Sequence, residues 1–170
     1  MTDERGTTTG EMMAGDDLAV AFKGAMRRLA SGVAVATARG DDGPTGMAAT
    51  SITSLTVEPP AVLLCVNRTA SLHPMLGIGG NICINLLSRD QQDVSAAFGG
   101  AVPREQRFTI GHWRDDMHGL PMLDGAQANL ACTIEALTPY GTHSIAIARI
   151  DAVRLSDDID PLIYQNGKYL

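Results

Sequence analysis

The stretch Gly46–Met–Ala–Ala–Thr–Ser–Ile–Thr–Ser–Leu–Thr–Val–Glu–Pro–Pro60 is the most informative part of the chain. Its last eleven residues, 50–60, contain three Thr, two Ser and a single charge, Glu58. β-Branched and hydroxyl residues favour a strand, and a double proline ends one. A strand of this composition can bury one face and still offer hydroxyl and backbone N–H groups to a bound molecule. The stretch therefore predicts a strand that lines the site of an anionic or strongly polar ligand.

Apolar periodicity on either side predicts one helix followed by a series of strands. Residues 16–31 carry apolar side chains at helical spacing, with Asp16 or Asp17 to cap the start and Gly32 to end the helix. The quoted stretch is expected to pair as one strand with the strand before it. We expect further strands over the β-branched or alternating segments 33–38, 61–67, 82–87, 126–137 and 142–155. The run 61–67 is continuously apolar, which predicts burial on both of its faces.

Three local signals complete this pattern. Ser71 can cap a short helix, and Ser88 with Gln91 forms a capping box for a helix that ends near Phe98. Asn166–Gly167 predicts the tight turn of a C-terminal hairpin. Because strands and helices do not alternate regularly, the sequence favours a mainly β fold with attached helices, built as an antiparallel barrel.

Length and charge limit the organisation and the partners. The 170 residues suit one domain over 16–170, preceded by an acidic, polar tail over 1–15 that lacks the features of a secretory signal. The net charge of −6 argues against nucleic acid as a partner, and no apolar run is long enough for a membrane span. Three cysteines without close spacing predict reduced thiols in a cytoplasmic protein, namely Cys65, Cys83 and Cys132.

Several common kinds of active site are poorly matched. The four histidines, at positions 73, 112, 118 and 143, are scattered, and the sequence has none of the local His or Cys pairs that zinc sites use. There is no Gly–x–Ser–x–Gly nucleophile motif. Residues 77–80 are glycine-rich but precede a strand, so they do not match a dinucleotide-binding fingerprint. What remains is the segment from Asn67 to Ser71, which enters a helix and can either bind an anion there or simply cap the helix.

The order of motifs along residues 20–170 resembles the short-chain flavin reductases, the reductase components of two-component flavin monooxygenases. The resemblance begins in the stretch from Gly46 to Ser71 and continues to the C-terminus through further motifs, which follow one another in the same order as in the family. These later motifs are Asn85–Leu–Leu–Ser88, Arg107–Phe108 with Trp113, Gly119–Leu–Pro–Met–Leu–Asp–Gly–Ala126, Gly141–Thr–His–Ser–Ile145 and Pro161–Leu–Ile–Tyr–Gln–Asn–Gly–Lys–Tyr169. The family has an FMN-binding split β-barrel fold, so the same antiparallel fold is implied here.

The resemblance implies a flavin site along the hydroxyl-rich strand. The family often has Asn where Thr50 stands and Phe where Ile52 stands, so the contacts to the flavin ring are expected to differ there. The positions that match the family's flavin site are Gly46, Met47, Ala48, Thr50, Ser51, Cys65, Val66, Asn67, Ser71, Leu72, Ala97 and Phe98. Of these, Ser71 and Leu72 match the region near the ribityl phosphate.

The resemblance also implies a nicotinamide site and a reaction. His143 matches a histidine beside the nicotinamide and is the implied catalytic residue, as an orienting donor. The C-terminal hairpin matches a segment that covers the nicotinamide nucleotide, with contacts from Tyr164, Gln165, Asn166, Gly167 and Tyr169. Many relatives carry His–Arg at 165–166, so the loss of that cation favours NADH over NADPH. Hydride is expected to pass from nicotinamide C4 to flavin N5 of FMN or FAD, without a metal.

The implied partners are a second copy of the chain, with the flavin near the subunit boundary, and a separate monooxygenase that receives reduced flavin. Two other functions fit the same residues. One is a flavin-binding split barrel without reductase activity, such as an electron carrier or sensor, which needs neither His143 nor the hairpin. The other is a barrel that binds a different small polar ligand.

Overall fold

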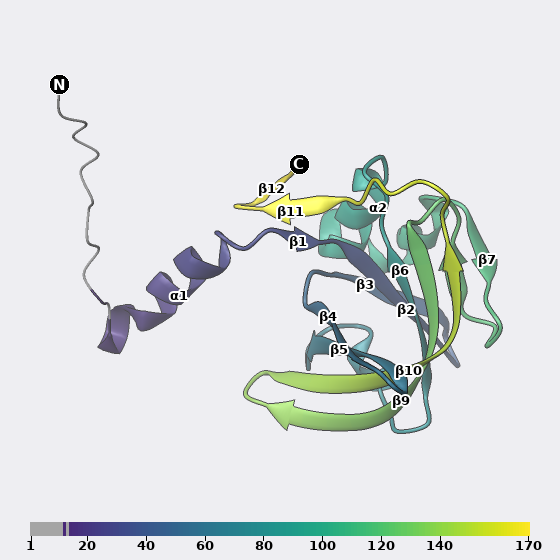
Figure 1. Ribbon diagram of the computed structural model, residues 1–170, viewed down its shortest axis with the longest axis horizontal. Helices are drawn as coiled ribbons and strands as arrows, with labels where there is room; N and C mark the ends of the chain where they lie inside the picture. The colour runs from purple at the N-terminus through teal and green to yellow at the C-terminus, as the bar shows by residue number, and fades with distance from the viewer. Residues whose placement is uncertain (1–11, 13) are drawn as a thin grey trace.

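The computed structural model describes residue 12 and residues 14–170, and its largest element is a seven-stranded antiparallel sheet that curls into a barrel (Figure 1). The order of strands in this sheet is β3-β2-β6-β9-β10-β5-β4. Its members are β2 (Ala34–Gly40), β3 (Gly43–Ala49), β4 (Ile52–Val57), β5 (Pro60–Asn67), β6 (Asn81–Leu86), β9 (Ala128–Tyr140) and β10 (His143–Leu155). The antiparallel barrel predicted from the sequence is thus confirmed.

The connection between β3 and β4 explains the curl. These two strands are the edges of the sheet, yet only Thr50 and Ser51 separate them in the chain. Since neighbouring residues cannot lie far apart, the two edges must approach each other at this point. Ser51 remains attached to β5, because its hydroxyl donates to the Cys65 carbonyl at 2.8 Å. The sequence predicted one strand over this stretch; that prediction is wrong, because the chain bends at Thr50–Ser51 and continues on the other edge.

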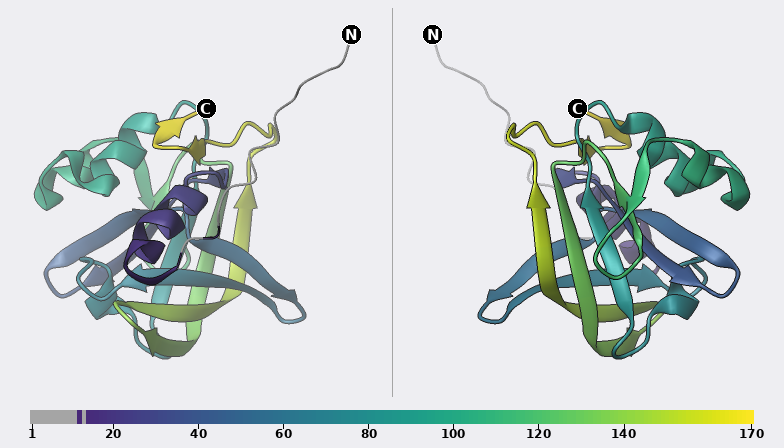
Figure 2. Two further views of the ribbon diagram at one scale, coloured as in Figure 1. Left: turned by 90° about the vertical axis from the view of Figure 1, so that its left-hand side faces the viewer. Right: turned by 90° about the vertical axis from the view of Figure 1, so that its right-hand side faces the viewer.

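Two small sheets and several short helical segments surround the barrel. The first small sheet joins β1 (Ser31–Gly32), β11 (Ile163–Gln165) and β12 (Lys168–Tyr169), and the second joins β7 (Trp113–Asp115) to β8 (Pro121–Leu123). The helical segments are η1 (Gly15–Asp17), α1 (Leu18–Met26), η2 (His73–Met75), α2 (Gln92–Ala96), η3 (Ala97–Ala101) and η4 (Arg104–Thr109). Figure 2 shows α2 and the segments after it gathered at one side of the barrel.

Strand β2 is buried on both faces and separates two apolar cores. Ala34, Ala36 and Ala38 face the barrel interior, where they meet strands β5, β6, β9 and β10. Val33, just before the strand, and Val35 face the other side and pack against residues of α2 and β8, among them Val94 and Leu123. The run 61–67 was predicted to be buried on both faces as well. Only one of its faces is, since Leu63 and Cys65 remain half-buried.

Three predicted helix boundaries differ from the structure. The first helix, predicted over 16–31, ends at Met26, and neither Asp16 nor Asp17 caps it with its side chain. The helix predicted at Ser71 is a single 3-10 turn that begins at His73 and has no side-chain cap. A turn of three residues has almost no macrodipole, so the anion site predicted at its start loses its physical basis.

The remaining predicted elements are confirmed with small changes. Gln91 accepts from the Ser88 backbone N–H at 3.1 Å, which is half of the predicted capping box, whereas the Ser88 hydroxyl donates to Gly125 instead. The C-terminal hairpin turns at Asn166 and Gly167, which both have positive φ. The predicted tail over 1–15 falls almost entirely outside the described residues. None of the helices formed by the described residues is long and apolar enough to cross a membrane.

Candidate functional site

Four neighbouring cavities form a continuous groove that starts beside β3 and ends at α1. We call it the β3 groove and name each cavity after one residue. They are the Arg107 cavity of about 420 Å³, the Tyr169 cavity of about 380 Å³, the Lys23 cavity of about 340 Å³ and the Arg28 cavity of about 540 Å³. Ala48 and Gly99 line both of the first two cavities, and Thr50 and Tyr164 line both the second and the third. The groove is therefore long enough for more than one ring system.

The Arg107 cavity has a cationic wall. Arg107 and Arg104, both from η4, line it together with Ser71 and Thr69 from the β5–η2 connection. One terminal nitrogen of Arg107, Nη1, donates to the Gly46 carbonyl at 3.1 Å and lies 3.5 Å from the Ser71 hydroxyl. Its Nε is buried and has no hydrogen-bond partner among the described residues. The protein therefore leaves part of the Arg107 guanidinium unpaired, and its positive charge in this cavity suits an anionic ligand such as a phosphate.

An aromatic cluster holds η4 against the barrel. Phe98, Phe108 and Trp113 contact one another pairwise, with ring centroids 5.0 to 5.3 Å apart. The Trp113 indole N–H donates to the Ile110 carbonyl at 2.8 Å, which fixes the ring at the end of η4. Three consecutive segments, η3, η4 and β7, thus pack together and place Arg107 at a defined position.

Gly46 is required by this packing. A Cβ atom at position 46 would lie 2.8 Å from the Phe98 ring and 2.9 Å from the Ala36 carbonyl oxygen. Both distances are shorter than real Cβ contacts. Glycine at 46 therefore allows Phe98 to lie against β3 at the floor of the groove.

The Tyr169 cavity lies between the end of β3 and the C-terminal hairpin. Ala48, Ala49 and Thr50 form one wall, and Ser95, Ala96 and Tyr169 form part of the other. The Tyr169 hydroxyl and the Ser95 hydroxyl are 2.9 Å apart, and the Tyr164 and Tyr169 rings meet edge to face at 5.4 Å. Small side chains on one wall and aromatic rings on the other suit a flat ring system.

The opposite end of the groove is formed by α1 and the hairpin. The Lys23 cavity is lined by Phe22, Lys23 and Met26 of α1 and by Arg27 just after it, together with residues 164–167. The Arg28 cavity continues it along Arg27 and Arg28. Figure 1 shows the tip of the β11–β12 hairpin directed at the C-terminal end of α1.

His143 lies outside the groove, close to its Arg107 end. It is exposed at the start of β10, and its Nδ1 lies 2.9 Å from the Thr142 hydroxyl. It pairs across the sheet with Asn67, whose side-chain oxygen accepts two hydrogen bonds from Thr69, at 2.9 Å each. Because Thr69 lines the Arg107 cavity, His143 stands near that end, whereas the hairpin lines the other three cavities.

The structure gathers many of the predicted site residues along the groove, but not all of them. Those that line it are Met47, Ala48, Thr50, Ser71, Phe98, Tyr164, Gln165, Asn166, Gly167 and Tyr169. The others, Gly46, Ser51, Cys65, Val66, Asn67, Leu72, Ala97 and His143, do not line these cavities. The side chains of Val66, Leu72 and Ala97 are fully buried in the cores, so only their backbone could meet a ligand.

Sequence reasoning missed the two arginines of the groove's cationic wall. Arg107 lay within a quoted motif, but it received no role because some sixty residues separate it from the strand that it touches. Arg104 carried no signal at all. Lys23, Arg27 and Arg28 fall within the predicted helix 16–31, and helical periodicity assigns them no role.

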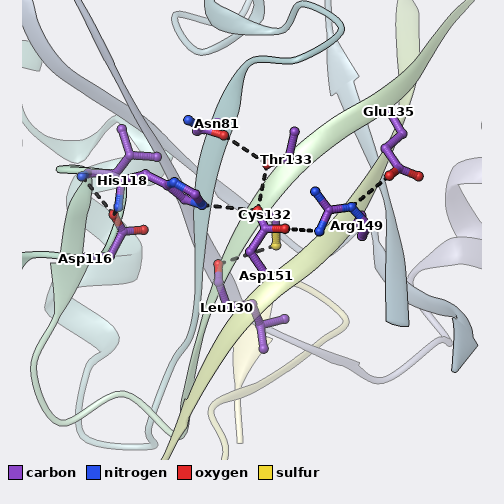
Figure 3. Close-up of polar contacts among 10 residues, drawn as sticks. Asn81, Asp116, His118, Leu130, Cys132, Thr133, Glu135, Arg149 and Asp151 are labelled. Atoms are coloured by element: carbon purple, nitrogen blue, oxygen red, sulfur yellow. Dashed lines mark hydrogen bonds and ion pairs between the residues drawn. The ribbon is translucent and has the colours of Figure 1, made fainter. Parts of the chain in front are cut away.

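A second cluster of titratable side chains lies outside the groove (Figure 3). Asp151 sits at a register irregularity of β10, between Ile150 and Ala152, and a bulge of this kind redirects a side chain. Its carboxylate accepts from Thr133 at 2.6 Å, lies 3.1 Å from the His118 ring nitrogen and pairs with Arg149.

The charges around Asp151 decide its ionisation. Burial opposes the charged form, but hydrogen bonds from Thr133 and His118 and the charge of Arg149 outweigh it and hold the pKa of the Asp151 carboxyl below its usual range. Thr133 belongs to β9 and His118 to the β7–β8 loop, whereas Arg149 lies on β10 with Asp151 itself. The cluster thus ties the β7–β8 loop to β9 and β10, and among the described residues it contains no group able to hold a metal ion.

Comparison with known proteins identifies the class to which this fold and groove belong. The model of the flavin reductase like domain matches residues 26–170. The chain is 39% identical over 148 residues to FMN reductase (NADH) RutF of Stutzerimonas stutzeri, which covers 87% of this chain and 85% of that protein. It is 36% identical over 146 residues to the 4-hydroxyphenylacetate 3-monooxygenase reductase component of Pseudomonas aeruginosa, covering 85% and 86% of the two chains.

Solved structures of flavin reductases share this fold. BorF, the flavin reductase component of a bacterial two-component tryptophan halogenase, superposes with a TM-score of 0.80 at 31% identity and covers 89% of this chain and 96% of its own. The NADH:FAD oxidoreductase SgcE6 of Streptomyces globisporus, in complex with NAD and FAD fragments, has a TM-score of 0.85 at 25% identity, covering 94% and 96%. The chain belongs to the flavin reductase like family, and the split-barrel fold expected from the resemblance is confirmed.

Proposed function

We propose that this chain is an NADH-dependent flavin reductase that binds its flavin in the Arg107 and Tyr169 cavities and supplies reduced FMN or FAD to a separate monooxygenase. The observation that carries the site assignment is Arg107, which lines the Arg107 cavity and whose buried Nε has no hydrogen-bond partner among the described residues. The Tyr169 cavity beside it shares the lining residues Ala48 and Gly99. The activity follows from the family and from relatives named as NADH-dependent FMN reductases.

The protein's task in this reaction is to position two ring systems and exclude water. When bound, the flavin supplies the hydride acceptor, N5, for the hydride of nicotinamide C4. Arg107 and Ser71 bind the flavin phosphate in the Arg107 cavity, which Phe98 also lines, and the Tyr169 cavity holds the ring. No side chain is needed as a nucleophile, which agrees with the missing catalytic motifs.

His143 and the C-terminal hairpin serve the nicotinamide nucleotide. The hairpin lies over the Tyr169 cavity and shields it from water through Tyr164 and Tyr169. His143 orients the nicotinamide as a hydrogen-bond donor, and its exposed position at the start of β10 leaves it accessible to an incoming substrate. Gln165 and Asn166 carry no charge for a 2′-phosphate, which supports NADH over NADPH.

Anaerobic mixing of the purified protein with NADH and FMN, FAD or riboflavin tests the activity. We expect the visible absorption of the flavin to bleach faster with NADH than with NADPH. If flavin binds but neither nucleotide bleaches it, the chain is a flavin-binding barrel without reductase activity. A His143→Ala variant that binds flavin normally and is reduced as fast as wild type would remove the role given to His143.

The functional unit in this proposal is a homodimer. Helix α1 buries none of its side chains within the chain, and Leu18, Val20 and Phe22 remain more than half exposed. An apolar cavity of about 620 Å³, lined by residues of β2, β4 and β10 among others, lies open on the barrel. A second copy would cover such surfaces. Size-exclusion chromatography with light scattering should give twice the chain mass of 17.9 kDa.

A cytoplasmic location completes the proposal. It is supported by the three cysteines, none of which forms a disulfide in the structure. Burial raises the pKa of the Cys132 thiol to about 12 and that of Cys83 still further, so both remain protonated and unreactive.

A further inference from the structure

Positive charge is concentrated on one short segment at the end of the β3 groove. Lys23, Arg27 and Arg28 fall within a stretch of six residues, 23–28, that covers the end of α1 and the turn after it. The chain as a whole has a net charge of −6. Lys23 and Arg27 line the Lys23 cavity, and Arg27 and Arg28 line the Arg28 cavity. Among the described residues, no Asp or Glu lines either cavity. This end of the groove is therefore suited to an anion.

Hydrogen bonds fix the position of these cations relative to the hairpin. The Asn166 backbone N–H donates to the Arg27 carbonyl at 3.0 Å, and the Gln165 side-chain amide donates to the Arg28 carbonyl at 3.0 Å. The Arg28 guanidinium folds back onto the Gly24 carbonyl. The two segments, which stand at opposite ends of the sequence, thus form one wall, so a ligand under the hairpin also meets the cations.

The rest of the lining narrows the class of anion. Phe22, Met26 and Leu29 bring apolar surface into the Lys23 cavity beside Lys23 and Arg27. A ligand that carries phosphates next to an aromatic ring satisfies both kinds of side chain. The cavity also shares Thr50 and Tyr164 with the Tyr169 cavity, so the same ligand can extend from one into the other.

We propose that Lys23 and Arg27 bind the pyrophosphate of a dinucleotide whose other end lies in the Tyr169 cavity, and that Arg28 supports them electrostatically. This assignment rests on the proposed function, which places the flavin ring in that cavity and the nicotinamide nucleotide at the hairpin that covers it. NADH and FAD both carry such a pyrophosphate, whereas FMN has a single phosphate. The helix thereby supplies the positive charge that the hairpin lacks at Gln165 and Asn166.

The double variant Lys23→Gln/Arg27→Gln tests the proposal, with Arg89→Gln as the matched control. Arg89 is exposed, pairs only with Asp160 outside the groove, and loses the same kind of charge. Binding of ADP-ribose, which has the pyrophosphate but no nicotinamide, is measured by calorimetry on wild type and both variants. Steady-state oxidation of NADH is then measured with FMN and, separately, with FAD, at low and high salt.

We expect the Kd of ADP-ribose and the KM of NADH with FMN to rise about tenfold in the double variant, since exposed charge pairs contribute little each. The kcat and the KM of FMN should stay unchanged, and high salt should reduce the difference. If only the KM of FAD rises, the bound pyrophosphate is that of FAD.

Unchanged values for ADP-ribose, NADH and FAD, relative to Arg89→Gln, would overturn the proposal. If the wild-type protein does not oxidise NADH in the presence of flavin, the proposed function is overturned. The effect of the double variant on ADP-ribose binding still tests the role of Lys23 and Arg27 in that case.

Discussion

The two ends of the β3 groove are built differently. At the Arg107 end, the cation lies on η4 beneath three packed aromatic rings, and its guanidinium bonds to the backbone of β3. At the α1 end, the cations stand on a helix with no buried residue, attached to the hairpin by two hydrogen bonds. Packed aromatic side chains hold the Arg107 end in place, whereas hydrogen bonds between exposed segments hold the α1 end.

This difference suits two ligands with different demands. A site whose side chains are already held in place loses little conformational freedom on binding, so it binds its ligand tightly for few contacts. A surface site loses more conformational freedom when its ligand binds, so it binds less tightly, but its ligand can enter and leave readily. The buried end thus fits the flavin, and the exposed end fits a nucleotide that must be exchanged in every turnover.

The largest effect is expected at Gly46, where the buried end tolerates no added atom. Gly46→Ala should destabilise the protein by about 1–3 kcal/mol, as overpacked cores do, and should weaken flavin binding because Phe98 must move. Urea denaturation and flavin titration measure both. Gly77→Ala is the control, since a Cβ there meets nothing within 4 Å and should change stability by less than about 0.5 kcal/mol. Equal effects at the two glycines would contradict the role of Gly46.

Arg107→Met should weaken FMN binding about ten- to a hundredfold, because it removes charged hydrogen bonds to the phosphate. Riboflavin, which has no phosphate, should bind the variant and wild type almost equally. Fluorescence titration of both flavins gives the two ratios. An equal loss for riboflavin would mean that Arg107 supports the fold of the cavity instead of the phosphate.

The cluster around Asp151 should make the buried end sensitive to acid. It holds the β7–β8 loop, and β7 carries Trp113 of the aromatic cluster. Since the folded pKa of Asp151 is lowered, its stabilising effect is complete above the ordinary Asp pKa of about 3.9 and is lost as pH falls through the lowered value. Wild type should therefore lose more unfolding free energy between pH 6 and pH 3 than Asp151→Asn does. Exposed Asp157→Asn, as control, should behave like wild type.

The smallest effect is expected where the hairpin meets α1. Gln165→Ala removes one exposed hydrogen bond to the Arg28 carbonyl, so the KM of NADH should rise only about two- to fivefold. Binding of FMN should not change, because the other end of the groove is untouched. A larger loss of FMN than of NADH binding would remove the distinction between the two ends.

Periodicity and turn chemistry predicted most strands of the barrel, but not the site. The alternating pattern of 126–137 and the Asn166–Gly167 turn specify local conformations, and both appear as predicted. The bend at Thr50–Ser51 leaves no such pattern, because hydroxyl residues suit a strand and an exposed link equally well. Helix α1 was predicted too long because its apolar residues repeat as in a packed helix, although none is buried within the chain.

The site could be predicted only where one segment carries it. The cavity wall from Met47 to Thr50 is contiguous, and the sequence indicated it. Arg107 meets Gly46 through the folding of a loop sixty residues later, and no spacing rule reports such a contact. Motif order supplied the family, but the contacts of the individual residues come from the tertiary structure.

The two-residue link between β3 and β4 also limits how this groove can diversify. Thr50 lines two cavities, yet it belongs to the shortest connection between the two edges of the barrel. An insertion at Thr50–Ser51 would separate those edges and open the barrel, so loop length cannot vary here as it does in most binding sites. Changes in nucleotide preference must arise by substitution at this link, or by remodelling α1 and the C-terminal hairpin, which both lie outside the seven-stranded sheet.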